Sequence, residues 1–144
     1  MKYFIDSNIF LRYLLQDNKK MYQECLHFFN CSKKSGKNIY TSSIIFTEVY
    51  WVLLKVYCLP KKEIILFLQS VLSFKTLRFT EFFNLSLALN LLSKHNVKFI
   101  DCLISAHSDI QKGIMALVSY DRDFDKLGIK RLEPSDLSEK DFIE

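Results

Sequence analysis

Short apolar segments alternate along this chain with longer segments that have the spacing of amphipathic helices. The segments that read as strands lie at residues 2–5, 39–41, 77–79 and 114–119, with a candidate edge strand at 130–132. Strands separated by helices in this way pair in parallel and are joined by right-handed crossovers. The alternation therefore predicts an α/β fold with a central, mostly parallel sheet of four or five strands.

The expected helices follow from apolar spacing and from capping residues. Polar residues before the first and third helices leave two choices of cap, Ser7 or Asn8 and Ser42 or Ser43. We expect helices over residues 7–14, 19–34, 43–57, 60–71, 80–95 and 99–112, and a short one over 124–127. The last residues are mostly polar. We therefore predict one domain over residues 1–134 and a polar C-terminal tail over 135–144.

Composition narrows the class of protein. The 144 residues are 49% hydrophobic and 25% charged, which is typical of an ordered globular domain and excludes a disordered one. With 3 Gly and 2 Pro, a loop-rich all-β fold is disfavoured. The net charge of +4 is compatible with a polyanionic partner without requiring one. No apolar run approaches about 18 residues and a strand begins after Lys2, so we expect no membrane span, no signal peptide and a cytoplasmic location.

Four acidic residues stand in strongly apolar surroundings, where a carboxylate is costly unless its charge is compensated. Asp6 and Asp121 follow strands, at the sheet edge where α/β proteins bind ligands. Asp6 could also be a helix cap, Asp101 a first-turn residue that favours the helix dipole, and Asp121 a turn residue. Glu48 has no such explanation, because its helix is apolar almost all round, and we expect it to be buried there.

Together these acids indicate a metal site. Four carboxylates in one cleft raise one another's pKa unless a hard divalent cation keeps them ionised. Oxygen ligands suit Mg²⁺ or Mn²⁺, and one or two such ions could activate water against a phosphate ester. The motifs contain no histidine or lysine that would act as the base. The pattern therefore favours metal-dependent hydrolysis of a phosphate ester.

The ordered set of motifs resembles the PIN-domain nucleases, and most of all the toxin ribonucleases of VapBC-type toxin–antitoxin pairs. The resemblance covers residues 2–134 and rests on segments 4–8, 41–48, 99–106 and 119–124. It implies a three-layer α/β/α sandwich and an Mg²⁺- or Mn²⁺-dependent endoribonuclease that leaves 5′-phosphate and 3′-hydroxyl ends.

The resemblance also implies roles for individual residues. The acidic quartet of that family is matched by Asp6, Glu48, Asp101 and Asp121, and Asp123 matches a fifth acid. Three polar residues, Ser7, Asn8 and Ser119, match supporting positions that orient ligands. Two departures are mild: Cys102 stands where the family usually has a small residue such as Ala, and Ser105 precedes the more typical Ala106. Neither belongs to the quartet.

Partners follow partly from the residues and partly from the resemblance. The helices expected over residues 44–57 and 64–72 are apolar almost all round, so each is either central to a core or covered by another chain. The resemblance implies a homodimer and a VapB-type antitoxin whose C-terminal segment reaches the acidic site; a monomer with a tight core is the alternative. The basic residues nearest the motifs, and so the candidates for RNA contact, are Arg12, Lys55, Arg122 and Lys126.

Three rival functions make different demands on the sequence. A degenerate PIN domain would bind RNA or protein without cleaving, and the intact quartet argues against it. A receiver domain needs paired acids after its first strand and a lysine after a late strand. A haloacid-dehalogenase-like phosphatase needs a second Asp at the position of Asn8. The last two patterns are absent.

Overall fold

A five-stranded parallel sheet forms the centre of the computed structural model, which describes residues 1–143. The strands are β1 (Lys2–Ile5), β2 (Ile39–Thr41), β3 (Leu77–Phe79), β4 (Met115–Val118) and β5 (Arg131–Leu132), in the spatial order β3-β2-β1-β4-β5. All four neighbouring pairs are parallel. The predicted sheet and its strand positions are confirmed.

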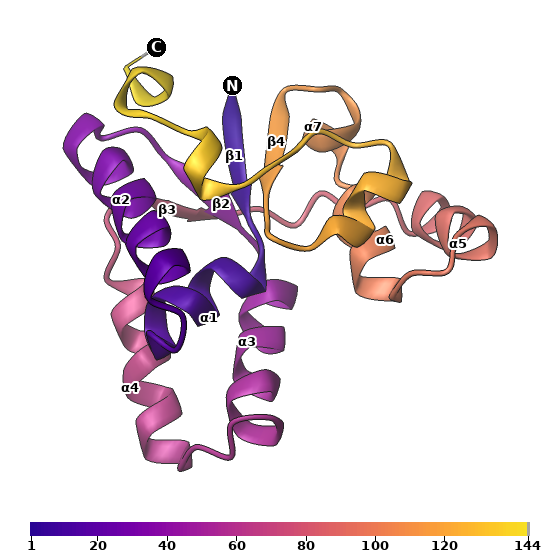
Figure 1. Cartoon of the computed structure of the whole chain (residues 1–144). Coiled ribbons are helices and arrows are strands. Elements are labelled where there is room, and N and C mark those ends of the chain that lie inside the picture. The colour runs from indigo at the N-terminus through magenta and orange to yellow at the C-terminus, as the bar shows by residue number, and fades with distance from the viewer. Residues whose placement is uncertain (144) are drawn as a thin grey trace.

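The strand order reverses direction between β1 and β4. From β1 the chain moves outward through β2 to β3, then crosses to the other side of β1 to form β4 and β5. Figure 1 shows the consequence: α1 to α4 lie on one side of the sheet, and α5 to α7 lie on the other. Helices that diverge at such a switch point leave a crevice beyond the carboxyl ends of the two strands. The sandwich predicted by resemblance is confirmed.

The helices of the first half lie close to their predicted positions. They are α1 (Ser7–Leu15), α2 (Lys19–Ser35), α3 (Ser43–Lys55) and α4 (Lys61–Leu72). Ser42 caps α3 by accepting a hydrogen bond from the Ile45 N–H at 3.3 Å. Neither Ser7 nor Asn8 caps α1, because its N-cap is Asp6, the alternative role given above for this acid, whose side chain accepts from the Ser7 N–H. The first acid of the predicted quartet therefore also starts a helix.

The helix predicted from residue 80 begins later. Residues 80–84 form no helix, and α5 spans Leu85–Lys94, capped by Asn84 through a 3.0 Å bond from the Leu87 N–H. The preceding residues are held by distant backbone: Thr80 N–H donates to Thr41 O, and Asn84 N–H donates to Ala106 O. Pairing with other segments outweighed the local helical pattern there.

The helix predicted over residues 99–112 is interrupted. It divides into α6 (Phe99–Ser105) and α7 (Ser108–Gln111), and between them His107 has extended backbone angles. The His107 ring is fully buried; its Nδ1 accepts from the Asp109 N–H, and its Nε2 lies 3.0 Å from Thr80 Oγ1. Burial of this one polar ring with its own partners breaks the helix.

The C-terminal residues pack against the domain. After the short 3₁₀ helix η1 (Arg122–Leu127) and β5, two more 3₁₀ helices, η2 (Pro134–Asp136) and η3 (Glu139–Phe142), lie against α2. Leu137 and Phe142 are buried, and the Phe142 ring lies 5.4 Å from that of Tyr3. The division into a domain over 1–134 and a tail over 135–144 stays a prediction. Within residues 1–143, no helix has both the length and the apolar character needed to cross a membrane.

Candidate active site

The predicted site lies at the switch point, where β1 and β4 end side by side. Ile5 is paired with Val118, so Asp6 and Ser119 leave the sheet at neighbouring positions. The Asp6 N–H donates to the Val118 carbonyl at 3.1 Å and extends the ladder by one residue. Topology thus brings together the first and last of the predicted motifs.

The Asp6 carboxylate is held by three nearby donors. Its Oδ1 accepts from the Ser7 N–H at 2.8 Å, and its Oδ2 accepts from Asn8 Nδ2 at 2.8 Å and from Ser119 Oγ at 2.6 Å. The side chain is 4% exposed. Asn8 and Ser119 thus hydrogen-bond to Asp6 through their side chains, whereas Ser7 contributes its backbone N–H.

Ser119 joins this half of the site to the next. Its hydroxyl donates to Asp6 and accepts from Asn8 Nδ2 at 2.9 Å and from the Asp121 N–H at 3.0 Å. Asn8 also accepts from the Tyr120 N–H at 3.2 Å. These bonds fix the backbone that follows β4, and with it the position of Asp121.

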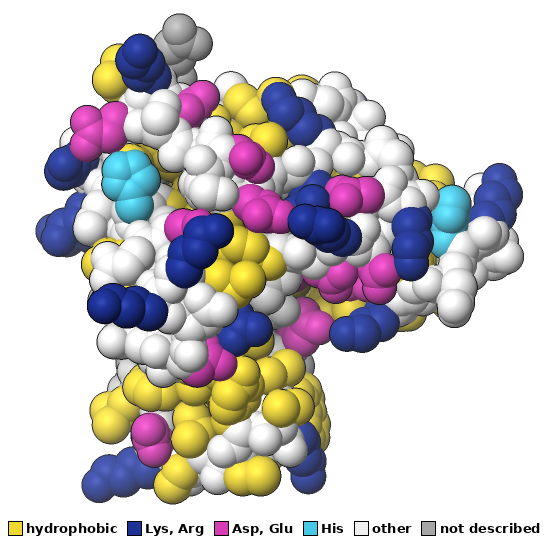
Figure 2. All heavy atoms as spheres, viewed as in Figure 1, with side chains coloured by type: hydrophobic (Ala, Val, Ile, Leu, Met, Phe, Trp, Pro, Cys, Tyr) yellow, Lys and Arg dark blue, Asp and Glu magenta, His cyan; other side chains and the backbone are white. Residues whose placement is uncertain are grey.

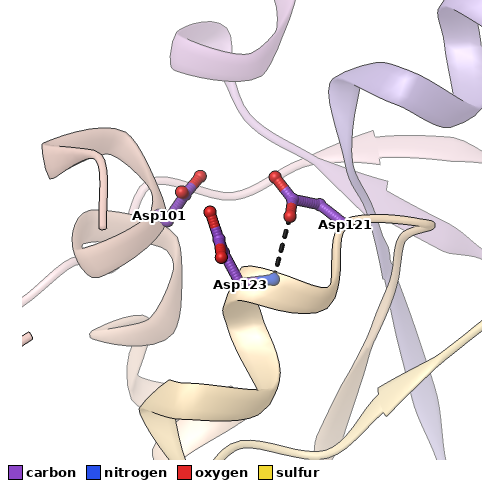
Figure 3. Close-up of side chains that lie close together, drawn as sticks. All are labelled: Asp101, Asp121 and Asp123. Carbon is purple, nitrogen blue, oxygen red and sulfur yellow. Dashed lines mark hydrogen bonds between the residues drawn. The ribbon is translucent and has the colours of Figure 1, made fainter. Parts of the chain in front are cut away.

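Three carboxylates form the other half of the site. Figure 3 shows Asp101 from α6 facing Asp121 and Asp123 from the start of η1, with the carboxylates turned toward one another. One oxygen from each lies within 4.8 Å of the others. The Asp123 N–H donates to Asp121 Oδ1 at 2.9 Å, and Lys126 Nζ lies 2.7 Å from Asp123 Oδ1. A cation placed between them would contact all three.

Among the three clustered carboxylates, Asp101 has an oxygen that is not hydrogen-bonded. Its side chain is buried, with 5% exposed, and its Oδ2 has no hydrogen-bond partner. An unsatisfied buried carboxylate oxygen is costly, so native structures rarely leave one without a bound group to accept it. The helix-dipole explanation for Asp101 accounts for a negative charge at that position but leaves Oδ2 without a partner.

Burial and mutual repulsion raise the pKa values at the centre of the site. Burial raises the pKa of Asp6 to about 7, with the charges of Glu48 and Asp101 adding to the effect against the Ser119 and Ser7 hydrogen bonds. Burial and the charge of Asp121 raise the pKa of Asp101 to about 6, with a smaller contribution from Glu48, while Lys98 opposes them. Both acids would ionise more readily beside a cation.

Glu48 belongs to the site electrostatically, but it is not buried. It lies on α3 and is partly exposed, and its charge acts on both Asp6 and Asp101. The expectation of a buried Glu48 was wrong because α3 is covered on one side only. Glu48 faces a pocket of about 360 Å³ lined by Ile44, Thr47, Trp51 and Ile100.

The donor set fits a hard divalent cation. All three residues of the closest group offer carboxylate oxygen, and no sulfur or imidazole ligand joins them in residues 1–143. The partnerless Asp101 Oδ2 supplies an independent reason for a ligand at this point. Asp101, Asp121 and Asp123 are the closest set, and Asp6 and Glu48 lie within electrostatic reach of it.

The basic residues around the site are not equally available. Arg12 is engaged by both Asp17 oxygens, and Lys126 is paired with Asp123. Arg122 is exposed, and Lys55 Nζ lies 5.7 Å from the centroid of the Trp51 ring. The sequence interpretation missed Lys98, an exposed residue whose charge lowers the pKa of Asp101. Its position three residues before Asp101, at the start of the helix, was the available signal.

Comparison with known proteins found a family model, a curated relative and a similar solved structure. The sequence model of the PIN domain matches residues 3–130. A protein named VapC ribonuclease from Aquifex aeolicus (strain VF5) is 26% identical over 136 residues, which cover 90% of this chain and 95% of that protein. The crystal structure of VapBC2 from Rickettsia felis bound to a DNA fragment from their promoter contains a similar fold. Its TM-score is 0.65 at 22% identity, covering 92% of this chain and 98% of that one.

Proposed function

Because this chain belongs to the PIN domain family, we propose that it is a divalent-metal-dependent endoribonuclease and the toxin of a toxin–antitoxin pair. The observation that carries the proposal is the buried Asp101 Oδ2 without a partner, facing two more carboxylates. The name of the Aquifex relative, VapC ribonuclease, supports RNA as the substrate. The Rickettsia structure, a VapBC complex, supports pairing with an antitoxin.

In this proposal Asp6, Glu48, Asp101 and Asp121 hold Mg²⁺ or Mn²⁺, as one or two ions, and Asp123 is a further ligand. When bound, the ion supplies Lewis-acid activation of water and positive charge for the phosphate. Asp101 and Asp121 present oxygens from opposite sides of the site, on α6 and at the start of η1. Glu48 approaches the site from α3 and is partly exposed to solvent.

The remaining groups orient the acids. Ser119 and Asn8 hold the Asp6 carboxylate in one position, so this carboxylate does not have to reorient during the reaction. The described histidines offer no general base in this site, since His107 is buried with Thr80 and the Asp109 N–H. Attack by water in line with the leaving 3′-oxygen yields 5′-phosphate and 3′-hydroxyl ends.

The proposed partners are a VapB-type antitoxin and a second copy of the chain, in the cytoplasm. Figure 2 shows hydrophobic side chains gathered over the part of the molecule that contains α3 and α4. Exposed apolar residues there include Val56, Ile65, Leu66 and Leu72. A second exposed apolar group includes Phe82, Leu85 and Leu89, before and along α5. Two apolar surfaces of this kind favour two protein contacts over a monomer.

The test uses purified protein free of any antitoxin. We expect it to cleave RNA with Mg²⁺ or Mn²⁺, to stop in excess chelator, and to leave ends that accept ligation at the 5′-phosphate. Glu63→Gln, an exposed acid in the first turn of α4, serves as the control and should behave like the wild type. Cleavage that persists in chelator would contradict the mechanism. RNA binding with no cleavage under any metal would favour the inactive PIN module instead.

A further inference from the structure

A small pocket opens directly beside the acidic site, between α3 and α6. It has a volume of about 360 Å³ and is lined by Ile44, Thr47, Glu48, Trp51 and Ile100. Two of these residues connect it to the proposed chemistry, because Glu48 is a proposed ligand and Ile100 immediately precedes Asp101. A ligand in the pocket would therefore lie next to the phosphate held by the acids.

Trp51 is the aromatic residue among those that line this pocket. It is the only tryptophan of the sequence, and half of it is exposed. It follows Glu48 by three residues on α3, so the two side chains lie on the same face of the helix. The edge-on Tyr50 ring is 5.9 Å away, and Lys55 Nζ lies 5.7 Å from the Trp51 ring centroid. The indole thus has an aromatic neighbour and a cation over its ring.

From this arrangement we propose that the pocket binds one unpaired base of the RNA strand, stacked on Trp51, next to the phosphate that is cut. The inference rests on the proposed ribonuclease function and adds to it a residue that binds the base beside the cleaved phosphate. Bases of any sequence stack on aromatic side chains, and a nearby cation contacts the strand's phosphates. Lys55 is placed for that contact, one helical turn beyond Trp51.

The size and lining of the pocket suit one planar base. Its volume lies at the lower end of the range for small-ligand pockets, about 300–1,000 Å³, which suits one planar ring system. Four of its five residues offer apolar or methyl surface, and the fifth is an acid assigned to the reaction. A base within a duplex is stacked on both faces by its neighbours, so only an unpaired base could use Trp51.

The single tryptophan permits a direct binding test. Wild-type protein in chelator, which prevents cleavage, is titrated with a single-stranded oligoadenylate of about ten nucleotides while Trp fluorescence is recorded. We expect saturable quenching by the single strand and at least tenfold weaker binding of the same strand within a duplex. Fluorescence that ignores RNA but changes with protein concentration would assign Trp51 to a contact between copies and overturn the proposal.

Kinetics of matched variants give the second readout. On an RNA that the wild type cleaves, Trp51→Ala should raise KM roughly ten- to a hundredfold with little change in kcat, while Trp51→Phe should retain most of the affinity. Ile114→Ala, at an apolar residue 47% exposed directly before β4 and so at the other end of the sheet, is the control and should leave KM unchanged. Circular dichroism verifies folding of each variant.

The outcomes separate this inference from the ribonuclease proposal. Metal-dependent cleavage with an unchanged KM in Trp51→Ala would overturn the base pocket and leave the ribonuclease standing. Quenching by single-stranded RNA without cleavage would overturn the ribonuclease and support the pocket as part of a binding surface.

Discussion

The two halves of the acidic site are built in opposite ways. Around Asp6, three donors hydrogen-bond to the carboxylate: a backbone N–H, an amide and a hydroxyl. Around Asp101, other carboxylates face it, and its Oδ2 has no partner. Folding alone gives both oxygens of Asp6 a hydrogen-bond partner, whereas Asp101 Oδ2 gains a partner only when a ligand binds. Substitutions in the two halves should therefore have different effects on the free energy of unfolding, even where both reduce the rate of cleavage.

The largest effect is expected from Asp101→Asn. Cleavage should fall about a thousandfold or more, beyond the ten- to hundredfold typical of residues that only orient ligands. Metal-free stability should rise, because an uncompensated buried charge is removed. Asp6→Asn should also lose activity but should not gain as much stability, since its new amide faces donors from Asn8 and Ser119. Cleavage rates and urea unfolding measure both, and equal stability changes would contradict the difference between the halves.

The second prediction concerns pH in the absence of metal. The folded-state pKa of Asp6 is about 7 against 3.8 for the free group, so the folded protein binds this proton more tightly than the unfolded chain. Stability from Asp6 is therefore complete below about pH 4 and is lost as pH rises toward 7, by about 2–4 kcal/mol. Asp101 acts in the same direction with a folded-state pKa of about 6.

Denaturant unfolding between pH 5 and 8 in chelator, repeated with Mg²⁺, measures this effect. Bound metal should remove most of the loss at high pH, because it stabilises the ionised acids. Metal-free protein that becomes more stable as pH rises through this window would contradict the raised pKa values.

A smaller effect should follow from Ser119→Ala. The change removes the donor to Asp6 and the acceptor for the Asp121 N–H, so we expect a loss of about 1–3 kcal/mol and a ten- to hundredfold slower reaction. Ser105→Ala is a matched control, because Ser105 is equally buried but its hydroxyl has no partner. The control should be neutral or slightly stabilising. Equal losses for the two variants would mean that the Ser119 hydrogen bonds contribute nothing specific.

The smallest effect is expected from Lys98→Ala. Lys98 is exposed, and it lowers the pKa of the buried Asp101. Its loss should weaken RNA binding by about two- to fivefold and reduce the salt dependence of KM, as expected for one phosphate contact. Lys61→Ala, an exposed lysine at the start of α4, is the comparison and should leave KM unchanged. Salt titrations of KM distinguish the two.

Much of the site could be predicted because strand ends are visible in sequence. Asp6 and Asp121 follow apolar runs, and parallel pairing brings such ends together without further information. The exposure of Glu48 could not be predicted, because an apolar helix does not reveal which of its faces the domain leaves uncovered. The break at His107 was also hidden, since it depends on Thr80 and on rings from distant segments. Trp51 looked like one more apolar helix residue until α6 was placed beside it.

The position of β4 in the sheet has a consequence for synthesis of the chain. The Asp6–Ser119 hydrogen bond spans 113 residues of sequence, and β4 is paired with the middle strand although it is made fourth. A nascent chain can pair β1, β2 and β3 early, but it has no completed acidic site until Ser119, Asp121 and Asp123 have left the ribosome. Polypeptides released early, before residue 119, would therefore be harmless to the RNA around them, including the message still being translated.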